Sequence, residues 1–370
     1  MTVSEVCRKA KENVRAIALA SEQDMNAMLA AAANALRERA DEIIAENKKD
    51  IAACTRGAQF IDRLMLDKKR IDGIAAGLEK LMELKCPVGE ILEERPLYNG
   101  LLLRRVRVPL GVIGIIYEAR PNVTADAIGL AVKSGNAVVL RGSKDAILSN
   151  KVITAVIKDA IRAAGYNAEF IQLIEDTTRE GAAQFMKMNG VIYVLIPRGS
   201  AGLIQNAVQN ATVPIIETGT GNCHVYFEKT ADIKKALPIL INAKTQRTSV
   251  CNACESLLID EEFARAHLTE IVRALRDKNV EIVACEKCRA LMPELAPATE
   301  EDLYAEFLAL KISVKIVNGV SEAIAHINQY GTHHSDSIVT EDSAAAEKFL
   351  NEVDSAAVYV NASTRFTDGF

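Results

Sequence analysis

The residues with the clearest capacity for chemistry surround Cys251, in the segment QRTSVCNAC at 246–254. A thiol that lies near a cation and polar hydrogen-bond donors can have a lowered pKa, which makes it a nucleophile at neutral pH. Arg247 supplies such a cation on the same segment. The alternative is that Cys251 is a small buried residue placed before a strand. The segment therefore suggests catalysis by a thiolate and leaves a structural role open.

A second interpretation of the cysteines is a metal site. Cys251-x-x-Cys254 and Cys285-x-x-Cys288 together imitate a four-cysteine zinc motif. The pairs are about thirty residues apart, whereas such motifs usually have about 15–20, and the intervening segment has the pattern of strand, helix and strand. We therefore expect no metal and treat the second pair as incidental. A reversible disulfide between Cys251 and Cys254 stays open as a hypothesis.

Two short loops could bind anions. The sequence RGSK at 141–144 follows a strand candidate, and its two cations would attract the 2′-phosphate of an adenosine ribose. On these residues alone a solvated loop is the simpler interpretation. The loop 197–202 opens a helix, whose backbone N–H groups could bind a phosphate or be capped by Ser200, and these two interpretations are about equal. Neither a GxGxxG fingerprint nor a Walker A loop is present.

The elements that position these loops alternate between strand and helix from residue 111 onward. Short apolar runs rich in β-branched residues predict strands that are buried on both faces, and the helical segments between them end near Gly135, Gly165 and Gly190, which suit C′ positions. This alternation predicts parallel, doubly wound sheets with ligands at the carboxyl ends of the strands. The expected strands are 112–117, 137–140, 170–174, 191–196, 213–216, 255–259, 313–317, 337–340 and 357–360.

We expect an α/β fold of two doubly wound, Rossmann-like domains with a β-hairpin arm. The first ~85 residues have helical periodicity, with Ser21 as an N-cap and Asp24 three residues on. A turn signal at Asn99-Gly100 predicts a hairpin. The expected boundaries are 1–91 together with 109–228 for a discontinuous first domain, 92–108 for the hairpin, and 229–370 for the second domain.

Composition restricts the function classes. The chain has 370 residues, of which 25 % are charged, and a formal net charge of −5, which gives no reason to expect nucleic acid or an anionic membrane as a partner. The N-terminus lacks the pattern of a signal peptide, and no stretch approaches the ~18 apolar residues of a membrane-spanning helix. We expect a cytoplasmic protein whose eight cysteines are thiols.

Five longer blocks extend in order over nearly the whole chain: PLGVIGIIYEARPNVT at 109–124, SGNAVVLRG at 134–142, ETGTGNCHV at 217–225, QRTSVCNAC at 246–254 and VDSAAVYVNASTRFTDG at 353–369. Together they resemble the aldehyde dehydrogenase superfamily, and within it the γ-glutamyl phosphate reductase family. The resemblance implies domains of aldehyde dehydrogenase type. The first would bind NADPH, the second would carry the nucleophilic cysteine, and the hairpin would serve oligomerisation.

The resemblance also implies a reaction, the second step of proline biosynthesis: L-glutamyl 5-phosphate and NADPH give L-glutamate 5-semialdehyde, phosphate and NADP⁺. Cys251 matches the nucleophile that forms a thioester, and Asn122 matches the side chain that stabilises the oxyanion with the cysteine's own N–H. Glu217 matches the general base of hydrolytic relatives. Because this reaction needs no hydrolysis, we expect Glu217 to be structural or to relay protons.

For the cofactor, Arg141 occupies the place of a lysine that contacts the adenosine ribose, and Lys144 that of a glutamate in many NAD-preferring relatives. Both cations, in a loop that also holds Ser143, favour NADPH over NADH. Gly199-Ser200 matches the pair that receives the pyrophosphate, and Glu306 matches the carboxylate that holds the nicotinamide ribose.

Charge and motif position make four residues candidates for the phosphate and carboxylate of the substrate: Arg120, Arg247, Thr364 and Arg365. Two rivals stay open. One is an aldehyde dehydrogenase that oxidises or acylates with a small aldehyde, and the other is a zinc-binding regulatory protein without activity.

The resemblance implies partners as well. Relatives continue beyond the position of Phe370 with a strand that joins the hairpin, so we expect a homo-oligomer, a dimer or tetramer, when such a tail is present. The helical first ~85 residues leave no room for a kinase, so glutamate 5-kinase would be a separate partner.

Overall fold

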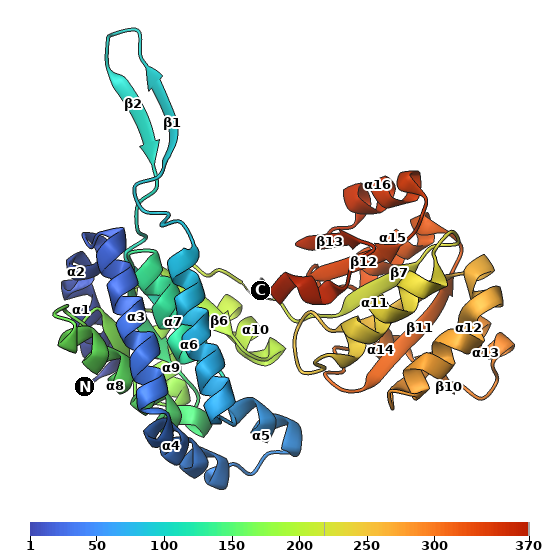
Figure 1. The fold of residues 1–370 in the computed structure, drawn as a ribbon, viewed down its shortest axis with the longest axis horizontal. Coiled ribbons are helices and arrows are strands. Elements are labelled where there is room, and N and C mark those ends of the chain that lie inside the picture. The colour runs from blue at the N-terminus through green and yellow to red at the C-terminus, as the bar shows by residue number, and fades with distance from the viewer. Residues whose placement is uncertain (218, 369–370) are drawn as a thin grey trace. The chain divides into compact units, whose positions relative to one another are not determined.

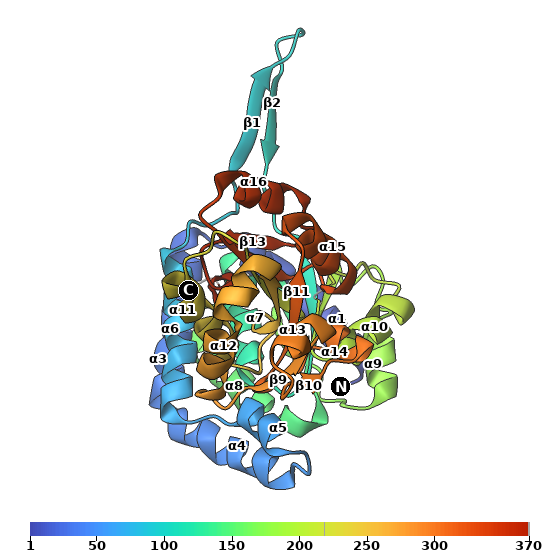
Figure 2. The ribbon, with the colours of Figure 1, turned by 90° about the vertical axis from the view of Figure 1, so that its right-hand side faces the viewer.

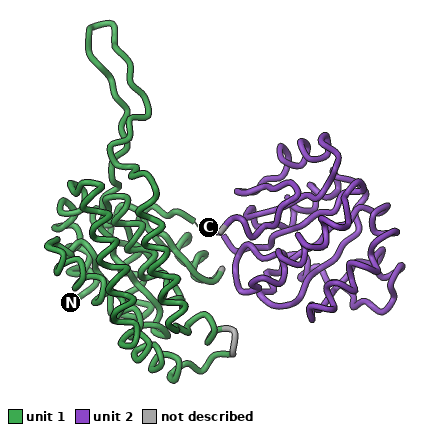
Figure 3. Tube along the Cα trace, viewed as in Figure 1, with its two compact units in different colours: residues 1–218 green, residues 219–370 purple. Residues whose placement is uncertain are grey.

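The computed structural model describes residues 1–217 and 219–368, so Gly369 and Phe370, the end of the expected second domain, lie outside the described residues. The chain divides into two compact units, Met1–Thr218 and Gly219–Phe370 (Figure 3). Each unit has its own sheet and its own hydrophobic core. The two units are described separately below.

The N-terminal segment of unit 1 is helical, as its periodicity predicts. Ser21 begins α3 with a capping box, in which its hydroxyl accepts from the Asp24 N–H and the Asp24 carboxylate accepts from the Ser21 N–H. This confirms the predicted start of that helix. The helices are α1 (Val3–Glu12), α2 (Val14–Ala18), α3 (Glu22–Glu38), α4 (Ala40–Ala53), α5 (Ala58–Leu64) and α6 (Lys68–Glu83).

The sheet of unit 1 is parallel, in the order β5-β4-β3-β6. From β3 the chain winds in one direction to β4 and β5 and then crosses back to β6, so the switch point lies between β3 and β6. The elements are β3 (Val112–Tyr117), α7 (Asn122–Lys133), β4 (Ala137–Arg141), η1 (Lys144–Ala146), α8 (Ile147–Ala163), β5 (Ile171–Leu173), α9 (Arg179–Phe185), β6 (Val194–Arg198) and α10 (Ala201–Asn210).

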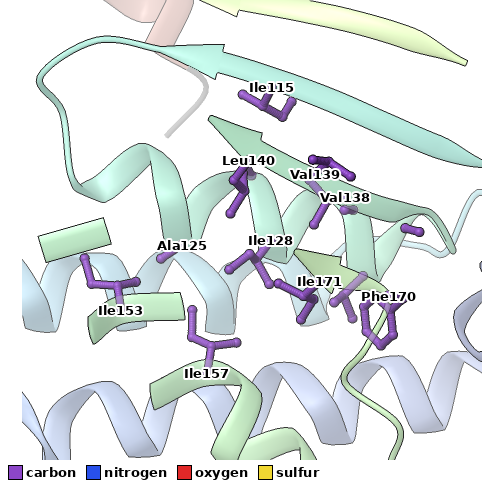
Figure 4. Close-up of a cluster of buried hydrophobic side chains, with 14 of the residues drawn as sticks. Ile115, Ala125, Ile128, Val138, Val139, Leu140, Ile153, Ile157, Phe170 and Ile171 are labelled. Carbon is purple, nitrogen blue, oxygen red and sulfur yellow. The ribbon is translucent and has the colours of Figure 1, made fainter. Parts of the chain in front are cut away.

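The core of unit 1 lies where α7 and α8 cover the sheet. Figure 4 shows Ile128 of α7 between Leu140 of β4 and Ile157 of α8, and these three side chains are buried. Burying one such side chain stabilises the fold by about 1.5–3 kcal/mol. Helices α3 and α6 pack on the outside of this layer, and α1 contacts β4, β5 and α9. Strands this thoroughly buried fix the loops at their carboxyl ends.

A two-stranded antiparallel hairpin interrupts unit 1, formed by β1 (Ile91–Pro96) and β2 (Leu102–Val106). Figures 1 and 2 show from two directions that it extends away from the rest of unit 1. Every residue of both strands is exposed. The predicted hairpin is therefore present.

The sheet of unit 2 is also parallel, in the order β10-β9-β11-β8-β7-β12-β13. Helices α11 and α12 pack on one face, and α15 and α16 on the other. The elements are β7 (Cys223–Phe227), α11 (Ile233–Thr245), β8 (Cys254–Asp260), α12 (Glu261–Arg276), β9 (Glu281–Ala284), α13 (Glu286–Leu291), β10 (Ala296–Pro297), α14 (Glu300–Tyr304), β11 (Lys311–Val317), α15 (Val320–Tyr330), β12 (Ser335–Val339), α16 (Ser343–Glu352), β13 (Ala357–Val360) and η2 (Thr364–Asp368).

Two expectations about strands differ from the structure. The segment 213–216, expected to be a strand, forms only an isolated bridge between Ile215 and Leu195. Strand β7 was not anticipated, although it is buried along its length and lies between β8 and β12. Because β7 pairs within the second sheet, the units divide at residues 218 and 219, ten residues before the expected boundary at 228.

Candidate active site

Cys251 lies in the loop between α11 and β8, half-buried, on a backbone turn in which the Ala253 N–H bonds the Val250 carbonyl. The turn containing Gly221 packs directly against this loop. A Cβ built on Gly221 would lie 1.3 Å from the Cys251 carbonyl oxygen, so only glycine allows this approach. The Cys223 thiol donates to the same carbonyl, with its sulfur 3.2 Å from the oxygen. The backbone of the candidate nucleophile is thus held from two sides.

Helix η2 completes the surroundings of this loop. Thr364 is fully buried, and its hydroxyl donates to the Asn252 carbonyl at 2.7 Å. The Arg365 guanidinium bonds the side-chain oxygen of Asn252, and its Nε donates to the Gln246 amide oxygen at 3.1 Å. The structure therefore brings two predicted substrate residues to the Cys251 loop, where Thr364 holds the loop in place and Arg365 adds a cation beside the nucleophile. Arg247 is exposed on the same loop.

Glu306 is bound to the turn that contacts Cys251. Its carboxylate accepts from the Gly221 N–H at 2.9 Å. Asn222 fixes the same turn because its buried amide donates to the carbonyls of Leu303 and Tyr330 at 2.8 and 2.9 Å. A predicted cofactor residue and the predicted nucleophile thus lie on either side of one glycine-rich turn.

A buried ion pair supports the Glu306 loop from inside unit 2. Lys244 and Glu255 bond each other with no exposure of either side chain. Burial raises the pKa of Glu255 to about 7, against the opposing effect of Lys244. The other Glu255 oxygen accepts from the Leu308 N–H at 3.2 Å, at a position where Leu308 has a left-handed φ of 52°. No sequence motif pointed to this pair.

In unit 1, the loop after β4 carries polar atoms available to a ligand. The Arg141 Nη2 donates to the carbonyls of Thr177 and Thr178 at 2.7 and 2.8 Å. Its Nε and the Ser143 hydroxyl are buried, and neither has a hydrogen-bond partner among the described residues. Because unpartnered buried polar groups cost free energy, these atoms fit a polar ligand such as the ribose and phosphate of a dinucleotide. Lys144 is exposed at the start of η1.

The loop after β6 already holds an anion, a carboxylate of the chain itself. Glu118, at the end of β3, accepts from the Ser200 N–H at 2.8 Å and from its hydroxyl at 3.0 Å. Ser200 also caps α10, so the capping role is confirmed. A Cβ on Gly199 would lie 2.9 Å from the Glu118 carboxylate. The carboxylate shows that this helix N-terminus, at the switch point of the sheet, accepts negative charge.

Asn122 begins α7, and its amide donates to the Asp126 carboxylate at 2.9 Å. Burial raises the pKa of Asp126 to about 6, opposed by the Asn122 hydrogen bond. The two residues are four positions apart, a spacing that places their side chains side by side on one helix face. Arg120 is half-buried and Glu217 is exposed, both in unit 1.

The zinc interpretation fails on strand register. Through β11, which pairs with both β8 and β9, Ala284 aligns with Leu257. Cys285 therefore lies about 13 Å farther along the strands than Cys254 and about 10 Å across them, too far to share one ion. Among the described residues no group of three or more His, Cys, Asp or Glu could hold a metal. Burial raises the pKa of the Cys254 thiol to about 12, and a disulfide between Cys251 and Cys254 stays a hypothesis.

No helix in the described ranges is both long and apolar enough to cross a lipid bilayer.

Comparisons with known proteins agree with this architecture. Residues 1–286 match the aldehyde dehydrogenase family. The chain is 49 % identical to a gamma-glutamyl phosphate reductase of Carboxydothermus hydrogenoformans over 100 % of this chain and 89 % of that protein. It is 50 % identical to one from Clostridium perfringens over 98 % of this chain and 88 % of that protein.

Solved structures give the same result. The crystal structure of gamma-glutamyl phosphate reductase from Thermotoga maritima matches with a TM-score of 0.94 and 44 % identity, over 100 % of this chain and 90 % of that one. An acetylating aldehyde dehydrogenase from Geobacillus thermoglucosidasius shares the fold, with a TM-score of 0.73 and 19 % identity, over 98 % of this chain and 86 % of that one. The chain therefore belongs to the aldehyde dehydrogenase family and, within it, to the γ-glutamyl phosphate reductases.

Proposed function

We propose that the protein reduces L-glutamyl 5-phosphate to L-glutamate 5-semialdehyde, with NADPH as the reductant and phosphate as the second product. This reaction is the second step of proline biosynthesis. The observation that carries the proposal is the position of Cys251, on a half-buried loop held by Gly221, Thr364 and Arg365, in a chain of this family.

Cys251 is the proposed nucleophile. Its sulfur attacks the acyl carbon, the bond to phosphate breaks, and a thioester remains on the protein. Bound NADPH supplies the hydride that reduces this thioester. The resulting hemithioacetal then releases the aldehyde and regenerates the thiol of Cys251.

Asn122 and the Cys251 N–H are the proposed donors to the oxyanion, and losing one such donor typically costs about 3 kcal/mol of barrier. The hydrogen bond from Asn122 to Asp126 supports this role, since it uses one amide hydrogen and fixes the direction of the other. We do not assign Glu217 the role of a general base in hydrolysis, because hydrolysis of the thioester would return glutamate instead of the aldehyde product.

NADPH rather than NADH is the proposed cofactor. Its adenosine ribose and 2′-phosphate would be held by Arg141, Ser143 and Lys144, which is supported by the unpartnered Arg141 Nε and Ser143 hydroxyl. Its pyrophosphate would take the place of the Glu118 carboxylate at Ser200, next to Gly199, and this requires Glu118 to move. Glu306 would hold the nicotinamide ribose.

The proposed ligands of the substrate's charged groups are Arg365, Arg247 and Arg120. Arg365 has the strongest support, since it already bonds Asn252 beside the nucleophile. Thr364 would contribute chiefly through its hydrogen bond to the Asn252 carbonyl, because its side chain is fully buried.

The hairpin 92–108 is the proposed oligomerisation arm. Leu92 and Leu101–Leu103 are exposed on it, and apolar side chains of this kind are normally covered by another surface. We further propose a homo-oligomer, a dimer or tetramer, in the cytoplasm, with glutamate 5-kinase as a separate partner that supplies the labile acyl phosphate.

The reaction run in reverse tests this function. NADP⁺ reduction would be followed with glutamate 5-semialdehyde in three matched solutions that contain phosphate, sulfate at equal ionic strength, or coenzyme A. We expect sustained turnover only in the solution that contains phosphate. Equal rates with sulfate would indicate an oxidising aldehyde dehydrogenase, and turnover with coenzyme A an acylating one.

A further inference from the structure

Cys285 and Cys288 form a second thiol site in unit 2. Cys285 directly follows β9 and is the N-cap residue of α13, and Cys288 lies one helical turn later. Their sulfur atoms are 3.6 Å apart. Cys285 is half-buried and packs at the margin of the core of unit 2, whereas Cys288 is fully buried. This is an arrangement of one half-buried thiol with a second, fully buried thiol beside it.

The hydrogen bonds around the pair give the two sulfurs different roles. The Cys285 thiol donates to the Cys288 sulfur, and the Cys285 sulfur accepts from the Ile316 N–H at 3.4 Å. The hydrogen bond between the two sulfurs, against the effect of burial, lowers the pKa of Cys285 to about 5, and the same bond together with burial raises the pKa of Cys288. Cys285 is therefore the more acidic of the two thiols.

Cys7, Cys223 and Cys254 lack this combination. Cys7 and Cys254 are buried, and burial raises the pKa of each to about 12. Cys223 is buried and bonded to the Cys251 carbonyl. The Cys285 site also lies apart from the Cys251 loop, since that loop precedes β8 whereas Cys285 follows β9, and both strands run parallel to β11.

We propose that Cys285 and Cys288 form a thiol–disulfide exchange site that reacts with organic disulfides and closes into a reversible disulfide, separately from Cys251. The Cys285 thiolate attacks one sulfur of the organic disulfide, forms a mixed disulfide and releases one thiolate. The Cys288 sulfur then attacks the Cys285 sulfur, and its proton leaves with the second thiol. Two protein thiols are oxidised as one organic disulfide is reduced to two thiols.

The local structure allows the second step with a small movement. A disulfide needs about 2.05 Å between sulfurs, so the pair must close by about 1.5 Å. Closure removes two weak interactions, the donation from Cys285 to the Cys288 sulfur and the donation from Cys288 to the Val314 carbonyl at 3.7 Å. Because Cys285 is on the turn into α13 and Cys288 is on the helix itself, side-chain rotation and a shift of the helix start can supply this movement.

The test uses the folded full chain with bis(2-hydroxyethyl) disulfide as the organic disulfide, followed by alkylation of the remaining thiols and tryptic digestion. Trypsin cleaves after Lys278, Lys287 and Arg289, so an oxidised pair joins the peptides 279–287 and 288–289. Wild type is expected to give the joined peptides, Cys288→Ser a mixed disulfide on Cys285, and Cys285→Ser no reaction at Cys288. A dithiol reductant should separate the joined peptides.

A pH series in Cys288→Ser, where the serine keeps a hydroxyl beside Cys285, measures the acidity of the Cys285 thiol. This quantity is separate from how deeply the thiol is buried. An ordinary thiol loses roughly 30-fold in thiolate between pH 7.5 and 6, whereas the exchange rate of Cys285 is expected to fall by less than about threefold. Recovery of the two peptides separately alkylated from wild type would overturn the proposal, as would exchange at Cys288 in folded Cys285→Ser. A 30-fold fall in rate would also overturn it. The thermal midpoint of each variant establishes that it is folded.

Discussion

Replacing Gly221 by alanine tests how closely its turn packs on the nucleophile loop. A Cβ at this position would lie 1.3 Å from the Cys251 carbonyl oxygen and 2.2 Å from its carbonyl carbon. Ordinary contact between such atoms needs about 3.5 Å, so turn and loop must separate by about 2 Å. The Gly221 N–H also donates to Glu306, so the same movement disturbs a proposed cofactor residue.

The expected cost follows from that displacement. A misplacement of about 1 Å can lower a rate on the order of 100-fold. We therefore expect Gly221→Ala to lose at least about 100-fold in kcat/KM, which corresponds to about 3 kcal/mol of transition-state stabilisation. The assay is the phosphate-dependent reduction of NADP⁺, with the thermal midpoint as a check on folding.

Gly219→Ala is the matched control, because it lies on the same turn and, among the described residues, its added Cβ would meet only the Thr332 carbonyl at 3.6 Å. We expect less than about a threefold loss, since this is an ordinary van der Waals contact. The reasoning is refuted if folded Gly221→Ala stays within threefold of wild type. It is also refuted if Gly219→Ala loses as much, because the loss would then not report the contact with Cys251.

Three further predictions concern other parts of the chain. Burial raises the pKa of the Asp126 carboxyl to about 6, so this group keeps its proton to higher pH in the folded protein than in the unfolded chain, and the free energy of unfolding falls as pH rises from about 4 to about 6. In urea unfolding, Asp126→Asn should remove about 2 kcal/mol of that fall. An unchanged pH profile of stability would contradict this. Lys244→Met leaves the Glu255 carboxylate buried without its cation, so we expect the free energy of unfolding, measured in urea, to fall by about 3–5 kcal/mol. Adding Glu255→Gln should partly restore it. A fall below about 1 kcal/mol would argue that the ion pair does not stabilise the fold. Lys144→Glu, at an exposed position that should not affect stability, is expected to lower the ratio of kcat/KM for NADPH to that for NADH by about 10-fold or more, and an unchanged ratio would remove Lys144 from the cofactor site.

Much of the fold was readable from the sequence because burial on both faces leaves a clear pattern. The runs 112–117 and 357–360 coincide with β3 and β13, and the Ser21 cap marks the start of α3. The run 213–216 has the same apolar character, yet only Ile215 makes a bridge to the sheet. Pairing across a sheet depends on distant residues, which a local pattern does not contain.

Strand β7 shows the opposite failure. Its polar His224 is stable in the core because the backbone N–H and the ring of His224 both bond the Asp336 carboxylate of β12, at 2.7 and 3.2 Å. Such a partner lies more than one hundred residues away in the sequence and cannot be anticipated from a short window. Because β7 belongs to the second sheet, the compact units divide at residues 218 and 219.

The candidate site shows a similar division. Sequence motifs identified the Cys251 loop and the strand-end loops. They did not reveal that Glu118 bonds Ser200, that Lys244 pairs with Glu255, or that Gly221 touches the Cys251 carbonyl. These relationships join separate elements, so they appear only once the chain is folded.

The most direct test of the central claim is a single-turnover experiment on Cys251. Wild-type enzyme would be mixed with NADP⁺ and glutamate 5-semialdehyde in the absence of phosphate. The protein would then be digested, and the masses of its peptides would be measured by mass spectrometry. The account predicts a burst of about one NADPH per chain, a glutamyl group on the peptide that contains Cys251, and rapid turnover once phosphate is added. Cys251→Ala should show neither burst nor modified peptide. Sustained turnover without phosphate, or a burst that survives in Cys251→Ala, would contradict the account.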